Sequence, residues 1–238
     1  SSWSIRINST GTRSRFEISR FSSFVTQPAR RPVTRNGCSV TARRIVNEGA
    51  SAITLSFENS ADVTLDGRLD AAEWADASES PLADIPRFSK DSETTLRGTV
   101  RVKRDGANLY VALTSNRPAR NRTVTAHDGP VWEDDSFEVM LTRDGKSVRH
   151  LVINANGAVH DETNGQKSWE SGAKAAVSMS ADGWQLELEI PIAALGGLPT
   201  AGNFGLSAYR SAVQNDIDAV AWNPPGWAFV DVKGFGTL

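Results

Sequence analysis

Four carboxylates fall within six positions of the segment from Trp132 to Glu138, which reads Trp-Glu-Asp-Asp-Ser-Phe-Glu. Two carboxylates that flank a sugar would be the arrangement of a glycoside hydrolase. Adjacent acids on an extended chain point to opposite faces, however, so this spacing does not place two of them across a cleft. We therefore favour a solvated loop that enters a strand, and we predict a protein without catalytic residues that is not an enzyme.

The strand after this loop gives Glu138 a definite side. Phe137 and Val139 alternate with Ser136 and Glu138, so an extended chain places Glu138 on the face opposite the apolar residues. A carboxylate on that second face can accept hydrogen bonds from ligand hydroxyl groups. It can equally pair with an arginine of a neighbouring strand, and the sequence leaves both interpretations open.

The three histidines do not by themselves indicate a metal site. His150 and His160 could meet at adjacent strand ends, but a metal centre needs a further ligand and no third spaced residue is evident. We therefore expect His127, His150 and His160 to be surface or turn residues. The nucleophile-elbow, P-loop and H-E-x-x-H motifs are also missing from the sequence.

Alternating apolar and polar residues predict an all-β fold. Residues 94–115 are typical of a hairpin with its turn at Asp105-Gly106. Many short strands separated by such turns favour a two-sheet antiparallel β-sandwich. A single turn or a short helix is expected at each of residues 70–75 and 191–195. Further strands are expected near residues 135–142, 148–154, 174–180, 183–190, 203–213 and 227–232.

Charge divides the 238-residue chain into two parts. Residues 1–60 hold nine arginines and three acids, a net charge of +6, whereas residues 61–238 carry −8. We predict a basic segment of strands and loops over 1–60, docked on a main domain over 61–238. The overall charge of −2 argues against a nucleic-acid partner, and no apolar run is long enough to span a membrane. The lone Cys38 excludes an internal disulfide.

Six sequence blocks follow one another in the main domain. They are Val63–Trp74, Val100–Leu113, Val131–Val139, Val152–Gly157, Asp182–Pro191 and Ala221–Gly236. In this order they resemble the family 9 carbohydrate-binding modules, which belong to the wider DOMON-like group of β-sandwiches. The resemblance covers about residues 62–238, and the first sixty residues have no counterpart in it.

The resemblance implies a module that holds a sugar or polysaccharide end between two aromatic side chains, with polar groups at the hydroxyls. The motif positions assign the aromatic roles to Trp132 and Trp227. They assign the polar roles to Asp134, Glu138 and Asn154. Indole faces suit the apolar C–H face of a sugar, and carboxylate and amide groups suit its hydroxyls.

The other tryptophans receive different expectations. Trp74 and Trp184 match structural positions of the family and are expected in the core, and Trp222 and Trp3 are expected to pack. Trp169 lies in a polar loop without a packing pattern, so we include it as a residue that could line the sugar site.

One position departs from the family pattern. The best-known sugar binders of the family have an arginine two residues before the asparagine of the fourth block, where this chain has Val152. Arg149 and Arg210 are candidates to replace it, although neither is at the matching position. A group that contacts sugar hydroxyls in the family is therefore missing at this position.

Family members also hold cations in acidic loops, so the resemblance implies calcium at Asp66, Asp70 and Asp105, with no organic cofactor. Oxygen ligands on turns suit Ca²⁺, but Asp-Gly is equally a common turn pair. The resemblance further implies a secreted, periplasmic or cell-surface location and fusion to other domains. The chain shows no signal peptide and does not begin with methionine, so we expect it to be a piece of a longer protein.

Two alternative functions stay open. A decayed sugar site would leave a structural or interaction domain, which the departure at Val152 favours. DOMON-like relatives also include haem-binding domains, for which the candidate axial ligands are Met140 and Met179 with His150 or His160.

Overall fold

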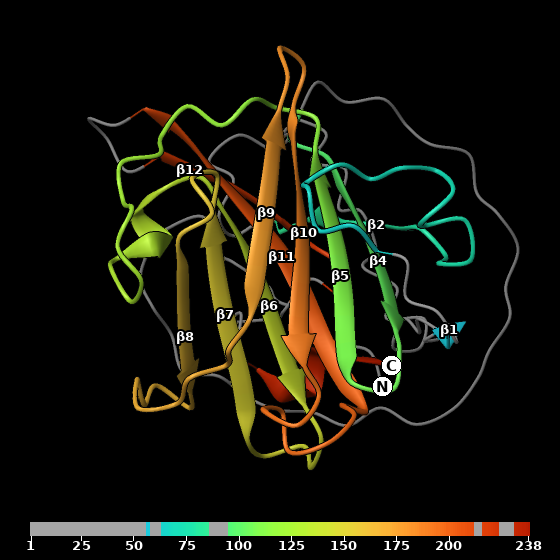
Figure 1. Cartoon of the computed structure of the whole chain (residues 1–238). Helices are drawn as coiled ribbons and strands as arrows, with labels where there is room; N and C mark the ends of the chain where they lie inside the picture. Colours follow the sequence, from blue (N-terminus) through green and yellow to red (C-terminus); the bar gives the residue numbers. More distant parts are fainter. Residues whose placement is uncertain (1–55, 58–62, 86–94, 212–215, 224–230) are drawn as a thin grey trace, which may run out of the picture. The chain divides into compact units, whose positions relative to one another are not determined.

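The structure, a computed structural model, describes residues 56–57, 63–85, 95–211, 216–223 and 231–238 (Figure 1). The chain divides into two compact units, Ser1–Ile45 and Val46–Leu238, and every described residue belongs to the second. The prediction for residues 1–60 therefore lies outside the described residues, except that Ser56–Phe57 forms a short strand, β1. Within these ranges the helices are single 3₁₀ turns, and none has the length and hydropathy of a membrane-spanning helix.

The predicted all-β sandwich is confirmed. Figure 1 shows a six-stranded sheet stacked on a seven-stranded one. The first has the order β1-β4-β5-β10-β9, with β2 also paired to β4, and the second has the order β3-β12-β11-β6-β7-β8, with β13 also paired to β11. All pairs are antiparallel except β1 with β4. The bounds are β2 Ser80–Pro81, β3 Ala83–Asp84, β4 Gly98–Arg104, β5 Asn108–Ser115, β6 Ser136–Thr142, β7 Val148–Asn154, β8 Val159–Thr163, β9 Lys174–Met179, β10 Trp184–Pro191, β11 Ala201–Ser211, β12 Asp216–Ala221 and β13 Gly236–Thr237.

Strong alternation located the long strands correctly. The hairpin over 94–115 is β4 and β5, and the segments predicted for β6, β7, β9, β10 and β11 match within two residues. Sequence reasoning missed β8 and β12. The strand expected over 227–232 is wrong where it can be checked, because Val232–Gly234 (η2) is a 3₁₀ turn. Turns form over residues 71–76 and 192–196, close to the two positions where a turn or short helix was expected.

The core fills the space between the two sheets. Each long strand turns one apolar row inward, and these rows interdigitate with Trp184 and Trp222, which are buried as predicted. The inner rows include Val100, Val102, Val111, Leu113, Leu186, Leu188, Phe137, Val139, Leu141, Leu151, Ile153, Phe204 and Leu206. The side chains on the outer face of each sheet therefore do not contribute to this core.

Candidate functional site

Trp132 is an exposed tryptophan on the loop that leads into β6. It lies in a single 3₁₀ turn, η1 (Val131–Glu133), whose first residue, Val131, is fully buried. Successive side chains of such a turn point about 120° apart. Anchoring Val131 therefore turns Trp132 outward, and 43% of its surface remains exposed.

Asp134 and Asn154 form a buried clamp under this loop. Asp134 accepts hydrogen bonds from the amides of Thr123 (2.9 Å) and Val124 (2.8 Å), and from the Asn154 side chain (2.8 Å). Asn154 also donates to the Val124 carbonyl at 2.7 Å. Neither side chain has exposed surface, so here they support the loop of Trp132 instead of facing solvent. A direct contact with a ligand would require these bonds to be exchanged.

Glu138 belongs to a row of charged side chains that crosses three strands. The strand register places Glu138 of β6, His150 of β7 and Glu162 of β8 on the outer face of the seven-stranded sheet. His150 Nε2 lies 3.1 Å from Glu138 Oε2, and its Nδ1 lies 3.2 Å from Glu162 Oε1. Glu138 therefore pairs with a basic residue of a neighbouring strand, as one sequence interpretation expected, but the partner is a histidine.

Both carboxylates favour the charged form of this histidine. Burial acts to lower the pKa of His150. The hydrogen bonds that its ring donates to Glu138 and Glu162, together with the charges of these carboxylates, outweigh burial and raise the pKa to about 9. The hydrogen bond with His150 is in turn the main cause of a lowered pKa at Glu162. The row therefore carries two carboxylates bridged by one imidazolium at neutral pH.

His160 connects this row to Trp132. Its Nε2 lies 3.7 Å from Glu162 Oε2, and its ring meets the Trp132 ring edge-on, with centroids 5.0 Å apart. The Lys167 ammonium lies 5.3 Å from the centroid of the Trp132 ring. An exposed indole thus stands beside an imidazole and an ammonium group, an arrangement that can stack an apolar face and form hydrogen bonds at its rim.

The position of the family arginine is filled by apolar packing. Val152 lies between His150 and Asn154 along β7 and is almost fully buried against Val131 and Ala158. These contacts belong to the same cluster that anchors η1. An arginine head group at this position would have to displace that packing.

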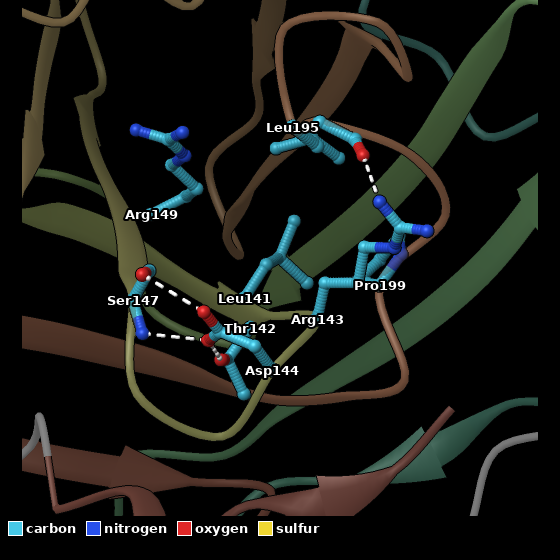
Figure 2. Close-up of a pocket in the computed structure, with 9 residues that line it drawn as sticks. Leu141, Thr142, Arg143, Asp144, Ser147, Arg149, Leu195 and Pro199 are labelled. Atoms are coloured by element: carbon cyan, nitrogen blue, oxygen red, sulfur yellow. Dashed lines mark hydrogen bonds between the residues drawn. The ribbon is translucent and has the colours of Figure 1, made fainter.

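The structure does not bring Trp169 to this site. Its indole donates to the Ala194 carbonyl at 3.1 Å and packs against the core between the sheets, whereas Trp132 lies against the outer face. The Arg149 guanidinium stacks 4.8 Å from the Trp169 ring centroid. Arg149 also borders a hollow of about 330 Å³ at the β6–β7 turn, where Figure 2 shows it and Arg143 on opposite sides.

The three aspartates proposed for calcium lie in turns. Asp66 accepts the Arg68 amide (2.8 Å), and Asp105 accepts the amides of Ala107 and Asn108 (both 2.6 Å). These contacts are the turn chemistry that the sequence left as the alternative. Asp66, Asp70 and Asp105 do not join a group of three or more close ligand residues in the described part of the chain. Calcium at these residues stays a prediction.

Of the residues proposed for haem ligation, Met140 lies directly opposite His150 on the neighbouring strand, and the nitrogens of His160 face Asp128 and Glu162. Met140 is buried on β6, whereas Met179 is exposed on β9 of the other sheet. Both ring nitrogens of His150 face carboxylates, so neither is directed at an iron. The haem alternative stays a prediction.

Two predicted residues lie where the structure gives no side chain. Trp227, the second stacking residue, lies outside the described residues, and so does the side chain of Arg210. Their roles stay predictions.

Sequence reasoning missed the charged row next to Glu138. Alternation along residues 148–154 places His150 on the face opposite the apolar residues, as it does Glu138. The sequence therefore contained enough information to predict that these two side chains share a face. Glu162 could not be found because β8 was not predicted, and the register between strands is not encoded in the alternation.

Comparison with known families gives a match over most of the chain. Residues 65–238 match the family described as Carbohydrate family 9 binding domain-like. A comparison with curated proteins gives no match.

Solved structures share the fold at low sequence identity. A protein from Bacteroides uniformis ATCC 8492, named for a proposed carbohydrate-binding role, has a TM-score of 0.66 at 16% identity, covering 80% of this chain and 99% of that one. A family 9 carbohydrate-binding module from Caldicellulosiruptor kristjanssonii in complex with glucose has a TM-score of 0.54 at 18% identity, covering 77% and 94%. A family 9 carbohydrate-binding module from the same organism in complex with cellotriose has a TM-score of 0.54 at 14% identity, covering 77% of this chain and 92% of that one.

Proposed function

Because the chain belongs to the Carbohydrate family 9 binding domain-like family, we propose that it is a non-catalytic carbohydrate-binding module that stacks a sugar on Trp132. The observation that carries the proposal is the exposed Trp132 indole, whose ring contacts His160, the neighbour of Glu162 in the charged row of Glu138, His150 and Glu162. The indole supplies an apolar face for the sugar ring, and the row supplies partners for its hydroxyls.

The finer parts of the proposal follow the family pattern. Trp227 is the second aromatic of a sandwich around the sugar. Asp134 and Asn154 depart from that pattern, because their buried hydrogen bonds support the Trp132 loop. The complexes of the Caldicellulosiruptor module make glucose and short β-glucans the first ligands to try. We further propose that the module is secreted, periplasmic or at the cell surface as part of a longer protein.

Titration calorimetry of the whole chain with glucose, cellotriose and a panel of other oligosaccharides tests this proposal. Replacing a stacking tryptophan by alanine removes about 1–3 kcal/mol, by analogy with base stacking on aromatic side chains, so Trp132→Ala should bind about fivefold to a hundredfold more weakly. Met179→Ala is the matched control, because Met179 is equally exposed but lies on the other sheet. Equal binding by Trp132→Ala and wild type would reject the stacking role.

One observation favours a second candidate function. The apolar burial of Val152, where sugar-binding relatives have an arginine, is consistent with a module that has become a structural or interaction domain. A folded protein that binds none of the panel sugars, nor insoluble polysaccharides in a pull-down, would support this alternative over the first.

A further inference from the structure

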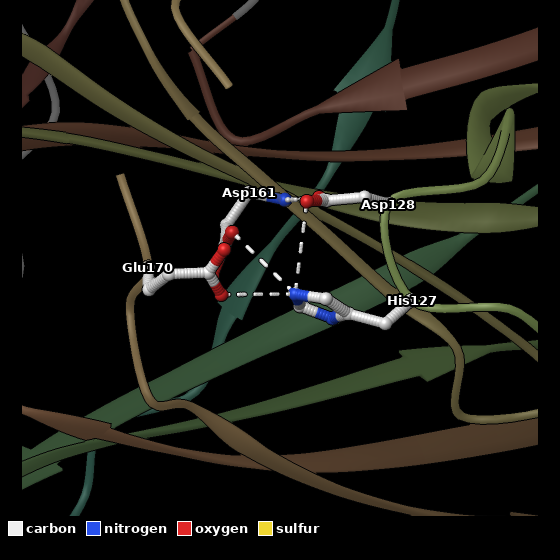
Figure 3. Close-up of side chains that lie close together, drawn as sticks. All are labelled: His127, Asp128, Asp161 and Glu170. Carbon is white, nitrogen blue, oxygen red and sulfur yellow. Dashed lines mark hydrogen bonds and ion pairs between the residues drawn. The ribbon is translucent and has the colours of Figure 1, made fainter. Parts of the chain in front are cut away.

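A second group of chemically active side chains lies beside the Trp132 loop. His127 and Asp128 come from the loop before η1, Asp161 comes from β8, and Glu170 comes from the segment after it (Figure 3). One ligand atom from each lies within 4.8 Å of the others. His127 Nε2 is 3.1 Å from Glu170 Oε2, 3.8 Å from Asp128 Oδ2 and 4.0 Å from Asp161 Oδ1.

Asp161 is the unusual member of this cluster. Its side chain is 1% exposed, and its Oδ2 accepts the Ser171 amide at 2.8 Å. The other oxygen, Oδ1, is buried, has no hydrogen-bond partner and is directed at His127 Nε2. A buried carboxylate oxygen without a hydrogen bond costs free energy, so this atom needs a positive partner.

The two inner ligands are held firmly and the two outer ones can adjust. Asp128 has a left-handed backbone (φ 57°), its amide donates to the Val159 carbonyl at 3.0 Å, and its Oδ1 lies 3.3 Å from the Asp161 amide. His127 and Glu170 are more than half exposed. Their rotamers can therefore shift by the small distance that coordination requires.

The spacing and chemistry of these atoms fit a transition metal. Zinc bound by nitrogen and oxygen at about 2.0–2.2 Å places its tetrahedral ligands about 3.3–3.6 Å apart, and the three distances from His127 Nε2 bracket this range. Imidazole suits zinc and its neighbours, whereas calcium prefers oxygen ligands alone. Three carboxylates also supply more than the charge needed to neutralise a divalent ion.

We propose that His127, Asp128, Asp161 and Glu170 form a binding site for a zinc-like divalent metal ion. The ion would connect the loop of Trp132 to β8 and to the segment that carries Lys167 over the Trp132 ring. Resting on the proposed sugar function, the expected consequence is that metal binding orders both sides of Trp132 and tightens sugar binding.

Calorimetric titration of the chelator-treated whole chain with zinc chloride tests the site without any sugar. We expect one zinc ion per chain with a dissociation constant of about 1 µM or tighter. At a free zinc concentration about a hundred times the dissociation constant, the melting temperature of the protein should rise by about 5–10 °C. His127→Gln and Asp161→Asn should each weaken zinc binding by about tenfold or more, since each removes a ligand atom.

Asp182→Asn is the matched control, because Asp182 is an exposed carboxylate in the turn between β9 and β10 and should leave zinc binding unchanged. If Asp161→Asn does not fold, the exposed His127 decides the outcome. No zinc binding, zinc binding that His127→Gln leaves intact, or tighter binding of calcium than of zinc would each overturn the proposal. Because none of these measurements involves sugar, a failed sugar titration leaves their result unaffected.

Discussion

Each sheet carries a glutamate on its outer face and a tryptophan from a preceding loop. The two residues are buried together on the six-stranded sheet and lie apart on the seven-stranded sheet. On the six-stranded sheet, Trp74 Nε1 donates to Glu187 Oε1 at 2.9 Å, and both side chains are fully buried. Glu187 Oε2 accepts the amides of Gly67 (2.9 Å) and Asp66 (3.1 Å). Burial raises the pKa of the Glu187 carboxyl. The hydrogen-bonded pair therefore covers part of the outer face of the six-stranded sheet and leaves neither side chain exposed to solvent.

On the seven-stranded sheet the corresponding pair is separated. Glu138 bonds to His150, and Trp132 stands outward on its own turn beside His160. A glycine explains part of the contrast: Gly67 has φ 82° and a β-carbon there would lie 2.6 Å from the Val177 backbone, so the Trp74 loop can lie directly on the sheet. The loop of Trp132 is instead anchored through Val131 and the buried Asp134, and its turn directs the indole outward. Burial of the pair stabilises the fold, and its separation leaves an indole for a ligand.

The largest difference between the two faces should appear on truncating Trp74. Trp74→Ala should lower the free energy of unfolding by about 3–5 kcal/mol, because it leaves a cavity and removes the hydrogen bond to Glu187. Urea denaturation measures this loss. The affinity of the folded protein for sugar should not change, and a selective loss of affinity would break the comparison.

The charged row should be the next most sensitive feature. His150→Gln should cost about 2–4 kcal/mol of stability at pH 7, since it leaves two partly buried carboxylates without their shared cation. His127→Gln, in metal-free buffer, is the control and should cost about 0.5 kcal/mol or less because His127 is largely exposed. Comparable losses in the two variants would contradict the role assigned to the row.

The pH dependence of stability sharpens the same point. His150 has its pKa raised to about 9, above the ordinary value of 6.5, so its contribution is complete below about pH 6.5. It should be lost as the pH rises through 9, reducing stability by up to about 3 kcal/mol. Thermal denaturation between pH 6 and 10 should show this decline in wild type. If His150→Gln declines as steeply, another group is responsible.

The parts of the fold with strong local patterns could be predicted from the sequence. Alternation fixed the long strands, and the block of Val63–Trp74 correctly indicated a buried Trp74. Short or weakly alternating strands such as β8 and β12 were missed, because their formation depends on contacts with neighbouring strands and not on a local sequence pattern.

The candidate site was predictable in part. Alternation gave the outward direction of Glu138, and the resemblance gave Trp132. The burial of Asp134 and Asn154 could not be predicted from the sequence, because it depends on how residues 121–124 fold back over them. The pairing of Glu138 with His150 depends on the register between β6 and β7. A shift of that register by one residue would place the two side chains on opposite faces of the sheet.

One variant, Trp132→Ala, should combine a small effect on stability with the largest effect on binding. Because Trp132 is the exposed member of the comparison, we expect its loss to cost about 1 kcal/mol of stability or less. Calorimetric titration of wild type, Trp132→Ala and Met179→Ala with the best sugar of the panel tests the central claim most directly. We predict a fivefold to hundredfold loss of affinity, on the order of 1–3 kcal/mol, for Trp132→Ala alone. Unchanged affinity in a folded Trp132→Ala protein would contradict the assignment of this face as the sugar site.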